Sequence, residues 1–264
     1  MLKFLKSILL AYLLLLGGLY LVQDWVIFRA SPLPNNYEFS FDQSFQEEFI
    51  ETPDGTQINT LFFPAQGVSK GLVFNNHGNR RNLSRWGRTA KEFTKHGYDV
   101  FFYDYRGFGK TEGKPSEENI HKDAAFLYEH MKNQYSEDSI IIYGRSLGTG
   151  VASKLASEND PKMLILETPY FNMADVGYMH LPIFPYNWLI KHSFRTDEWI
   201  GQVNAPIYIF HGTEDQLVPY ESSEKLVKLL KSSISELITL EGGGHRGLNR
   251  FEEYQQKMKE LLGD

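Results

Sequence analysis

Residues 139–150 read SIIIYGRSLGTG, and the fold can be worked out from this stretch. The apolar run Ser139–Tyr143 is typical of a buried strand, and helical composition begins at Leu147. Between them, residues 144–148 form the pattern GxSxG with Ser146 at its centre. In a strand–turn–helix context this pattern presents the serine hydroxyl at the tip of a sharp turn, where the two glycines leave room for strained backbone. Ser146 is therefore a candidate nucleophile, although five residues alone would also fit a plain helix start.

Short apolar runs that predict strands recur on both sides of this turn. Upstream, Phe49–Glu51 and Ile58–Phe63 flank the turn signal Pro53-Asp54-Gly55 and predict an antiparallel hairpin. The other predicted strands are residues 71–76, 99–104, 139–143, 163–166, 207–210 and 236–240, and the predicted helices are residues 83–96, 116–133, 147–158, 221–232 and 248–262. Because strands and helices alternate, we expect an α/β fold with a doubly wound, mostly parallel sheet and helices on both faces.

One connection breaks this alternation. Residues 168–201 lie between two predicted strands and are crowded with Tyr, Phe, Met, Trp and Pro. The segment is too long for an ordinary connection in a compact domain, so it is an insertion.

A serine hydroxyl needs an adjacent base near neutral pH, and the base needs a partner that fixes its tautomer. His245 is the candidate base, because it follows three glycines in a loop between the last predicted strand and the last predicted helix. The acid should lie between serine and histidine in the chain. Asp215, in the loop HGTEDQLVP after the strand 207–210, fits best, and Glu214 and Glu167 remain rivals.

Acyl transfer places negative charge on an oxygen, which fixed backbone donors should stabilise. We expect one donor to be the N–H of Leu147 and the other the N–H of Asn79, in the loop His77-Gly78-Asn79 after the strand 71–76. His77 is expected to brace this loop. The next two residues, Arg80 and Arg81, either attract an anionic group of a substrate or are plain solvated surface.

The N-terminus predicts a membrane segment. Lys3 and Lys6 precede the uncharged run Ile8–Val22, and the residues after it stay bulky instead of small, which favours an uncleaved anchor within residues 1–30 over a signal peptide. The run has no amphipathic period, which argues against a buried core helix. The basic N-terminus predicts a cytoplasmic start and an exported domain. Turn-forming residues at 31–36 read as a linker, and the domain is expected over residues 37–264.

The composition argues against several kinds of partner and of site. The net charge of −6 argues against a nucleic-acid partner, and the absence of cysteine excludes disulfides, thiolate nucleophiles and zinc–thiolate sites. No close-spaced His, Asp and Glu set predicts a metal, and we expect no cofactor.

Taken together, the motifs resemble the α/β-hydrolase superfamily, particularly its membrane-anchored branch similar to lysophospholipases and serine aminopeptidases. The resemblance covers about Phe49 to Leu262. It rests on HGN at 77–79, DYRGFGKTEG at 104–113, GRSLGTG at 144–150, ETPY at 167–170, HGTEDQLVP at 211–219 and GGGH at 242–245.

The resemblance implies an α/β-hydrolase fold with a cap over Ser146 at about residues 168–201. It also implies that ETPY opens this cap, which argues against Glu167 as the acid. The expected activity is hydrolysis of a carboxylic ester or thioester, in a lipid or other acyl ester, through an acyl-enzyme. The alternatives are an aminopeptidase or amidase of the same fold and a non-catalytic binding protein that has kept it.

Overall fold

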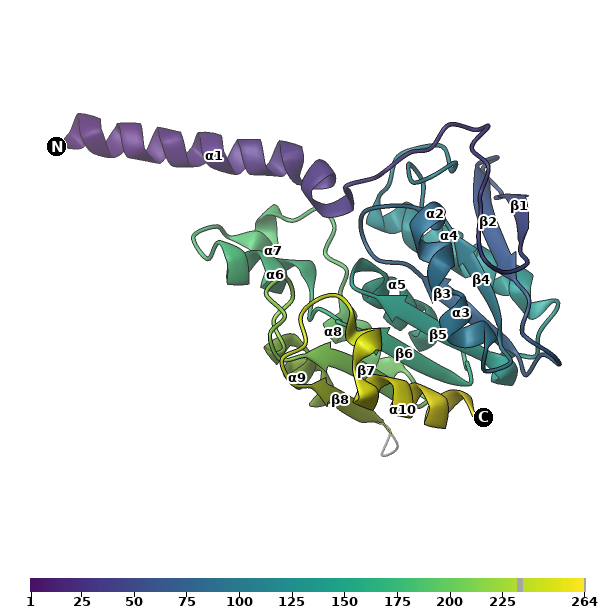
Figure 1. Cartoon of the computed structure of the whole chain (residues 1–264). Helices are drawn as coiled ribbons and strands as arrows, with labels where there is room; N and C mark the ends of the chain where they lie inside the picture. The colour runs from purple at the N-terminus through teal and green to yellow at the C-terminus, as the bar shows by residue number, and fades with distance from the viewer. Residues whose placement is uncertain (232–234, 264) are drawn as a thin grey trace.

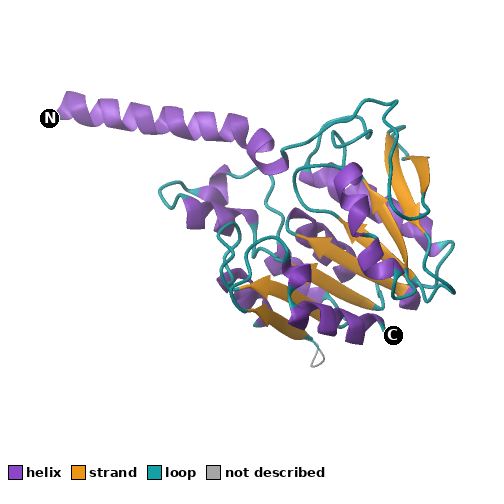
Figure 2. Ribbon diagram, viewed as in Figure 1, coloured by secondary structure: helices purple, strands orange, loops and turns teal. Residues whose placement is uncertain are grey.

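The computed structural model describes residues 1–231 and 235–263. Its centre is an eight-stranded sheet in the order β1-β2-β4-β3-β5-β6-β7-β8 (Figure 2). The strands are β1 (Gln46–Glu51), β2 (Gln57–Phe63), β3 (Leu72–Asn76), β4 (Asp99–Tyr103), β5 (Ile140–Arg145), β6 (Met163–Glu167), β7 (Ile207–Gly212) and β8 (Glu236–Leu240). β1 and β2 pair antiparallel, β2 joins β4 antiparallel, and all later pairs are parallel. The predicted α/β-hydrolase fold and its N-terminal hairpin are confirmed.

Helices cover both faces of the sheet, as the alternation predicts. On one face α4 (Glu117–Lys132) and α5 (Leu147–Ser157) share a core with the strands, and α9 (Glu221–Val227) adds Leu226 to it. On the other face the core is closed by α2 (Leu83–Trp86), α3 (Lys91–Thr94) and α10 (Glu252–Leu262). Burial on both faces explains why the parallel strands read as short continuous apolar runs.

Two predicted helices are interrupted. The helix expected at 83–96 divides at the 3₁₀ turn Gly87–Thr89, where a Cβ on Gly87 would come within 2.6 Å of the Phe41 ring. The helix expected at 248–262 begins as a 3₁₀ turn, Leu248–Arg250, and is broken by the extended residue Phe251. The helix expected at 221–232 ends at Val227, and its predicted last residue, Ser232, lies outside the described residues, as does Asp264.

The insertion lies between β6 and β7, and we call residues 168–201 the cap. It contains α6 (Met173–His180), α7 (Tyr186–Leu189) and α8 (Thr196–Trp199), and the 3₁₀ turn Ile200–Gln202 overlaps its end. Figure 1 shows α6 and α7 beside the long N-terminal helix, at the end of the sheet where the parallel strands finish.

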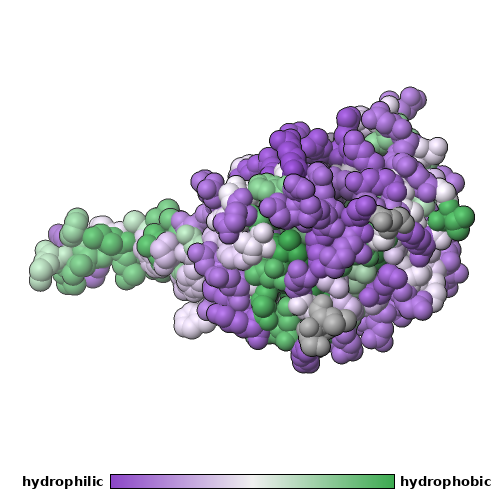
Figure 3. All heavy atoms as spheres, turned by 60° about the horizontal axis from the view of Figure 1, so that its bottom comes forward, coloured by the Kyte–Doolittle hydropathy of each residue, from purple (hydrophilic) through white to green (hydrophobic). Residues whose placement is uncertain are grey.

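The N-terminal helix α1 (Leu2–Phe28) projects from the domain (Figure 1). It is long and apolar enough to cross a membrane, and none of its most apolar 18-residue window is buried. In Figure 3 the projecting helix is mostly hydrophobic, whereas the domain surface is largely hydrophilic. Its last residue, Phe28, is different, because it is only 1% exposed and belongs to the core of the domain.

Candidate active site

Ser146 occupies a strained turn between β5 and α5. Its backbone has φ 49° and ψ −117°, a conformation that costs a non-glycine residue of the order of 1–3 kcal/mol. The turn is held by a hydrogen bond from Ser146 N–H to the Glu167 carbonyl, 2.9 Å long. A Cβ on Gly144 would lie 2.6 Å from that of Ala152, and one on Gly148 would lie 2.0 Å from the Asn76 oxygen. Both glycines of the GxSxG pattern are therefore required by close packing.

His245 and Asp215 form a hydrogen-bonded row with this serine. His245 Nε2 lies 2.9 Å from Ser146 Oγ, and His245 Nδ1 lies 2.7 Å from Asp215 Oδ2. Because an ionised carboxylate only accepts hydrogen bonds, Nδ1–H donates to Asp215 and Nε2 is left to accept the serine proton. His245 is 99 positions from Ser146 and 30 from Asp215 in the chain. The three residues meet because their loops follow the carboxyl ends of β5, β7 and β8.

The Asp215 carboxylate is held from several sides. Its Oδ1 accepts hydrogen bonds of 2.9 Å from Leu217 N–H and Val218 N–H. Its Oδ2 faces both His245 and His211, the latter at 3.2 Å. Burial acts to raise the pKa of Asp215, but the hydrogen bonds from His211 and His245 outweigh it and hold the pKa below its usual range. The group is therefore an anion that orients His245.

His211 is a site residue that sequence reasoning missed. It lies at the end of β7, where it is fully buried between Asp215 and the start of α9. Its Nδ1 lies 2.6 Å from Ser223 Oγ, and its Nε2 lies 2.8 Å from the Val218 carbonyl. The two acceptors at Nε2 fix the proton there, so His211 donates toward Asp215. The motif HGTEDQLVP contains both residues, but only the bent loop shows that they touch.

The two rival acids lie elsewhere. Glu214 is exposed, and its backbone N–H donates to the Gly243 carbonyl. Glu167 is buried, where it accepts hydrogen bonds from Tyr143 and Tyr254 and pairs with Arg145 at 3.1 Å. Neither carboxylate contacts His245.

The loop 77–79 lies directly beside the serine turn. Asn76 is the register partner of Gly144 in the β3–β5 pair, so the residues that follow each strand are neighbours. The N–H groups of Asn79 and Leu147 find no hydrogen-bond acceptor within the described part of the chain. Two free donors are thus available in the serine turn and in the loop beside it.

His77 is fully buried and stabilises this loop. Its Nδ1 lies 2.8 Å from the Gly78 carbonyl, and its ring lies 4.2 Å from that of Tyr105, whose hydroxyl donates to the His77 carbonyl. Its Nε2 faces the buried Asp104 at 3.4 Å. Burial raises the pKa of Asp104, and the contact with His77 opposes that rise.

Arg80 and Arg81 follow the loop on the surface. Both are exposed, both have φ 64°, and neither side chain has a partner among residues 1–231 and 235–263. Within the same residues, no group of three or more His, Asp or Glu side chains could hold a metal ion.

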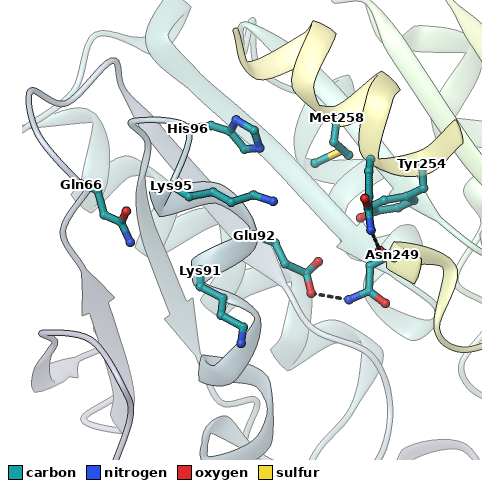
Figure 4. A pocket seen from close by; sticks show the side chains of 9 residues that line it. Gln66, Lys91, Glu92, Lys95, His96, Asn249, Tyr254 and Met258 are labelled. Carbon is teal, nitrogen blue, oxygen red and sulfur yellow. Dashed lines mark hydrogen bonds between the residues drawn. The ribbon is translucent and has the colours of Figure 1, made fainter. Parts of the chain in front are cut away.

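A pocket of about 400 Å³ opens away from the serine, between α3 and α10 (Figure 4). Glu92 and Asn249 join across it by a 2.7 Å hydrogen bond. Burial, together with the negative charge of Glu167, raises the pKa of Glu92 to about 7. Ser146, Asp215 and His245 are not among its lining residues.

The sheet order, the strained serine turn and the Ser146–His245–Asp215 row define the class of α/β-hydrolase-fold proteins. Comparison with known proteins supports the same class. Residues 67–196 match the family described as serine aminopeptidase, S33. An uncharacterized protein of Mycobacterium tuberculosis strain H37Rv is 33% identical over 199 residues, which cover 74% of this chain and 70% of that protein. The chain belongs to the α/β-hydrolase serine hydrolases.

Two further proteins are similar to this chain. Lysophosphatidylserine lipase ABHD12 of Danio rerio is 36% identical over 157 residues, which cover 53% of this chain and 41% of the lipase. A Pyrococcus furiosus esterase structure superposes with a TM-score of 0.72 at 19% identity, covering 89% of this chain and 97% of the esterase. The second likeness concerns the fold alone.

Proposed function

We propose that this protein is a membrane-anchored serine hydrolase that cleaves a carboxylic ester or thioester with a hydrophobic acyl group. The observation that carries the proposal is the row of hydrogen bonds from Ser146 Oγ through His245 to Asp215. A serine, a base and a base-orienting carboxylate at these distances are what nucleophilic acyl transfer requires.

The geometry supports a two-step reaction. Ser146 Oγ attacks the acyl carbon while His245 Nε2 takes its proton, and Asp215 stabilises the resulting imidazolium. The N–H groups of Asn79 and Leu147 donate to the oxyanion of the tetrahedral intermediate. His245 then gives its proton to the leaving alcohol or thiol, which leaves an acyl-enzyme on Ser146. Water, deprotonated by His245, attacks the acyl-enzyme, and the free acid leaves as the serine proton is restored.

The ester preference rests on the aromatic cap and on the similarity to the lysophosphatidylserine lipase. An aminopeptidase or amidase of the same fold is the main alternative, favoured by the description of the matching family. A non-catalytic binding protein is the second, and the intact hydrogen-bonded row argues against it.

Activity-based labelling tests the proposal. Full-length protein should be labelled at Ser146 by a fluorophosphonate, and Ser146→Ala should not. Unlabelled wild-type protein should hydrolyse p-nitrophenyl acyl esters faster than aminoacyl p-nitroanilides. A folded protein that does not label would refute the catalytic role, and preference for the anilides would replace the ester assignment with the amidase one.

We also propose that α1 is an uncleaved anchor, with the N-terminus in the cytoplasm and the hydrolase domain on the exported side. Lys3 and Lys6 supply the cytoplasmic charge. Phe28 supports the absence of cleavage, because removal of α1 would take this side chain out of the domain core. In the cysteine-free chain, Val68→Cys on the domain surface should react with a membrane-impermeant maleimide in intact cells. Reaction only after lysis would reverse the topology.

A further inference from the structure

The cap contacts α1 near the middle of the helix, within its apolar part. The Tyr12 ring stacks on Phe184 at 5.8 Å with an interplanar angle of 17°, and the Tyr12 hydroxyl donates to the Ile183 carbonyl at 2.9 Å. Leu16 and Leu19 pack against the same small core, whose buried members are Ala174, Phe184 and Tyr186. The cap therefore lies along the side of α1 and not only at its end, as the placement of α6 and α7 in Figure 1 also shows.

Toward its C-terminal end, α1 makes polar contacts with the cap, and these mark the level at which its apolar part ends. Gln23 is 5% exposed, donates to the Leu189 carbonyl at 3.2 Å and accepts from Lys191 N–H at 2.7 Å. One residue on, Asp24 pairs with His192 at 3.1 Å and with Lys191 at 3.6 Å. Charged and amide groups gather here because such groups are costly inside hydrocarbon.

The distance along the helix axis between the contacts of Tyr12 and those of Gln23 gives the depth of the cap in a bilayer. Eleven residues separate Tyr12 from Gln23, which at 1.5 Å per residue is about 16 Å along the helix axis. One leaflet of a bilayer core is roughly 15 Å thick. If Gln23 lies at the boundary, Phe184 and Ile183 lie deep in the hydrocarbon of that leaflet.

The sequence of this part of the cap suits such an environment. Residues 181–190 read LPIFPYNWLI and contain no charged side chain. Three of their large apolar side chains face outward, with Leu181 46%, Ile183 62% and Trp188 91% exposed. In water this would be an unusual loss of hydrophobic burial, but in a bilayer it is favourable.

The backbone of the segment also needs little water. Pro182 and Pro185 carry no N–H, and α7 supplies internal hydrogen bonds. The N–H groups bonded to carbonyls of the chain are those of Leu181, Tyr186, Trp188, Leu189 and Ile190. Unbonded backbone donors are the main obstacle to placing irregular chain in hydrocarbon, and here most are absent or satisfied.

We propose that residues 181–190 of the cap insert into the leaflet beside α1, so that Leu181, Ile183 and Trp188 contact lipid acyl chains. The proposal rests on the membrane role of α1. The cap also contacts the loop that holds Asp215: His180 Nε2 lies 2.9 Å from the Leu217 carbonyl, and Leu217 N–H donates to Asp215. An inserted cap would therefore lie close to the site. A lipid ester could then reach Ser146 from the leaflet without crossing water.

The absence of cysteine makes the test direct. Single variants Leu181→Cys, Ile183→Cys and Trp188→Cys of the full chain are labelled with the polarity-sensitive fluorophore NBD and reconstituted in phosphatidylcholine–phosphatidylglycerol vesicles. Leu14→Cys, 68% exposed on α1, is the matched membrane control, and Val68→Cys, 92% exposed before β3, is the water control. Lipids with a nitroxide on the acyl chain act as quencher.

Insertion predicts blue-shifted emission and quenching at the three cap positions, as at position 14, and neither effect at position 68. Quenching at position 14 alone would overturn the insertion while leaving the anchor intact. No quenching at position 14 would refute the anchor itself, and with it the insertion. Ile183→Glu with Trp188→Glu adds a functional readout. It should lower hydrolysis of vesicle-borne ester at least tenfold relative to hydrolysis of soluble ester, and an unchanged ratio would count against insertion.

Discussion

The side-chain amide of Asn79 donates to the backbone carbonyl of Ile27, which ties the loop beside Ser146 to the last turn of α1. The same side chain accepts from Arg80 N–H at 2.8 Å, so both ends of the amide are used. The backbone N–H of Asn79, a proposed oxyanion donor, is thereby held by a contact with the N-terminal helix. The helix α1 and the candidate active site are physically joined at this residue.

Asn79→Ala should weaken catalysis through this tie. It keeps the backbone N–H but loses a hydrogen bond worth about 1 kcal/mol, so kcat should fall about fivefold with KM little changed. The measurement is steady-state hydrolysis of a soluble ester. Asn82→Ala in the full chain is the control, because the side-chain amide of Asn82 donates to the Ser31 carbonyl, which lies outside α1. An equal loss in Asn82→Ala would mean that the bond to Ile27 is not what holds the loop.

Asp215→Asn should reduce kcat by roughly 10³- to 10⁴-fold, because an amide no longer holds His245 with its proton on Nδ1. Steady-state kinetics with a p-nitrophenyl ester measures the loss. Glu214→Gln is the matched control, since Glu214 directly precedes Asp215 in the chain and is exposed. A comparable loss in Glu214→Gln, or full activity in Asp215→Asn, would move the acid to another residue.

The parallel strands could be predicted because they are buried on both faces. Leu72, Val73 and Phe74 are all fully buried, so the sequence shows an unbroken apolar run bounded by turn residues. The position of the site follows from the same reasoning, since chain order places its residues at the carboxyl ends of successive strands.

What could not be predicted depends on contacts between distant segments. The break in the helix at Gly87 reflects Phe41, a residue far upstream that packs where a side chain would stand. The contact of Tyr12 with Phe184 spans most of the chain and has no local signal. His211 begins the motif HGTEDQLVP, but its contact with Asp215 arises from the bend that brings Val218 back to it.

His211→Gln should lower kcat about tenfold and leave KM nearly unchanged, because His211 holds Asp215 and does not face Ser146. Loss of its hydrogen bond removes one of the contacts that keep the pKa of Asp215 low. Because Asp215 then protonates more readily, the kcat/KM profile should fall earlier and more steeply than that of wild type as the pH is lowered, a change that a purely structural defect would not produce. His130→Gln, on α4 away from the site, is the control. An unshifted profile would assign His211 to folding alone.

Glu92→Gln should stabilise the protein above neutral pH. The folded pKa of Glu92, about 7, exceeds its ordinary value of 4.5, so the folded state holds this proton more tightly than the unfolded chain does. Stability is therefore lost as pH rises from about 4.5 to 7, and the loss persists at higher pH. A shift of this size corresponds to about 2 kcal/mol after allowance for partial exposure.

Glutamine keeps the acceptor for Asn249 and never ionises, so the variant should melt roughly 4–8 °C above wild type at pH 8 and level with it at pH 4.5. Thermal unfolding followed by circular dichroism at the two pH values measures this, with Glu118→Gln on exposed α4 surface as control. A gain of equal size at both pH values would show that packing, and not ionisation of Glu92, is responsible.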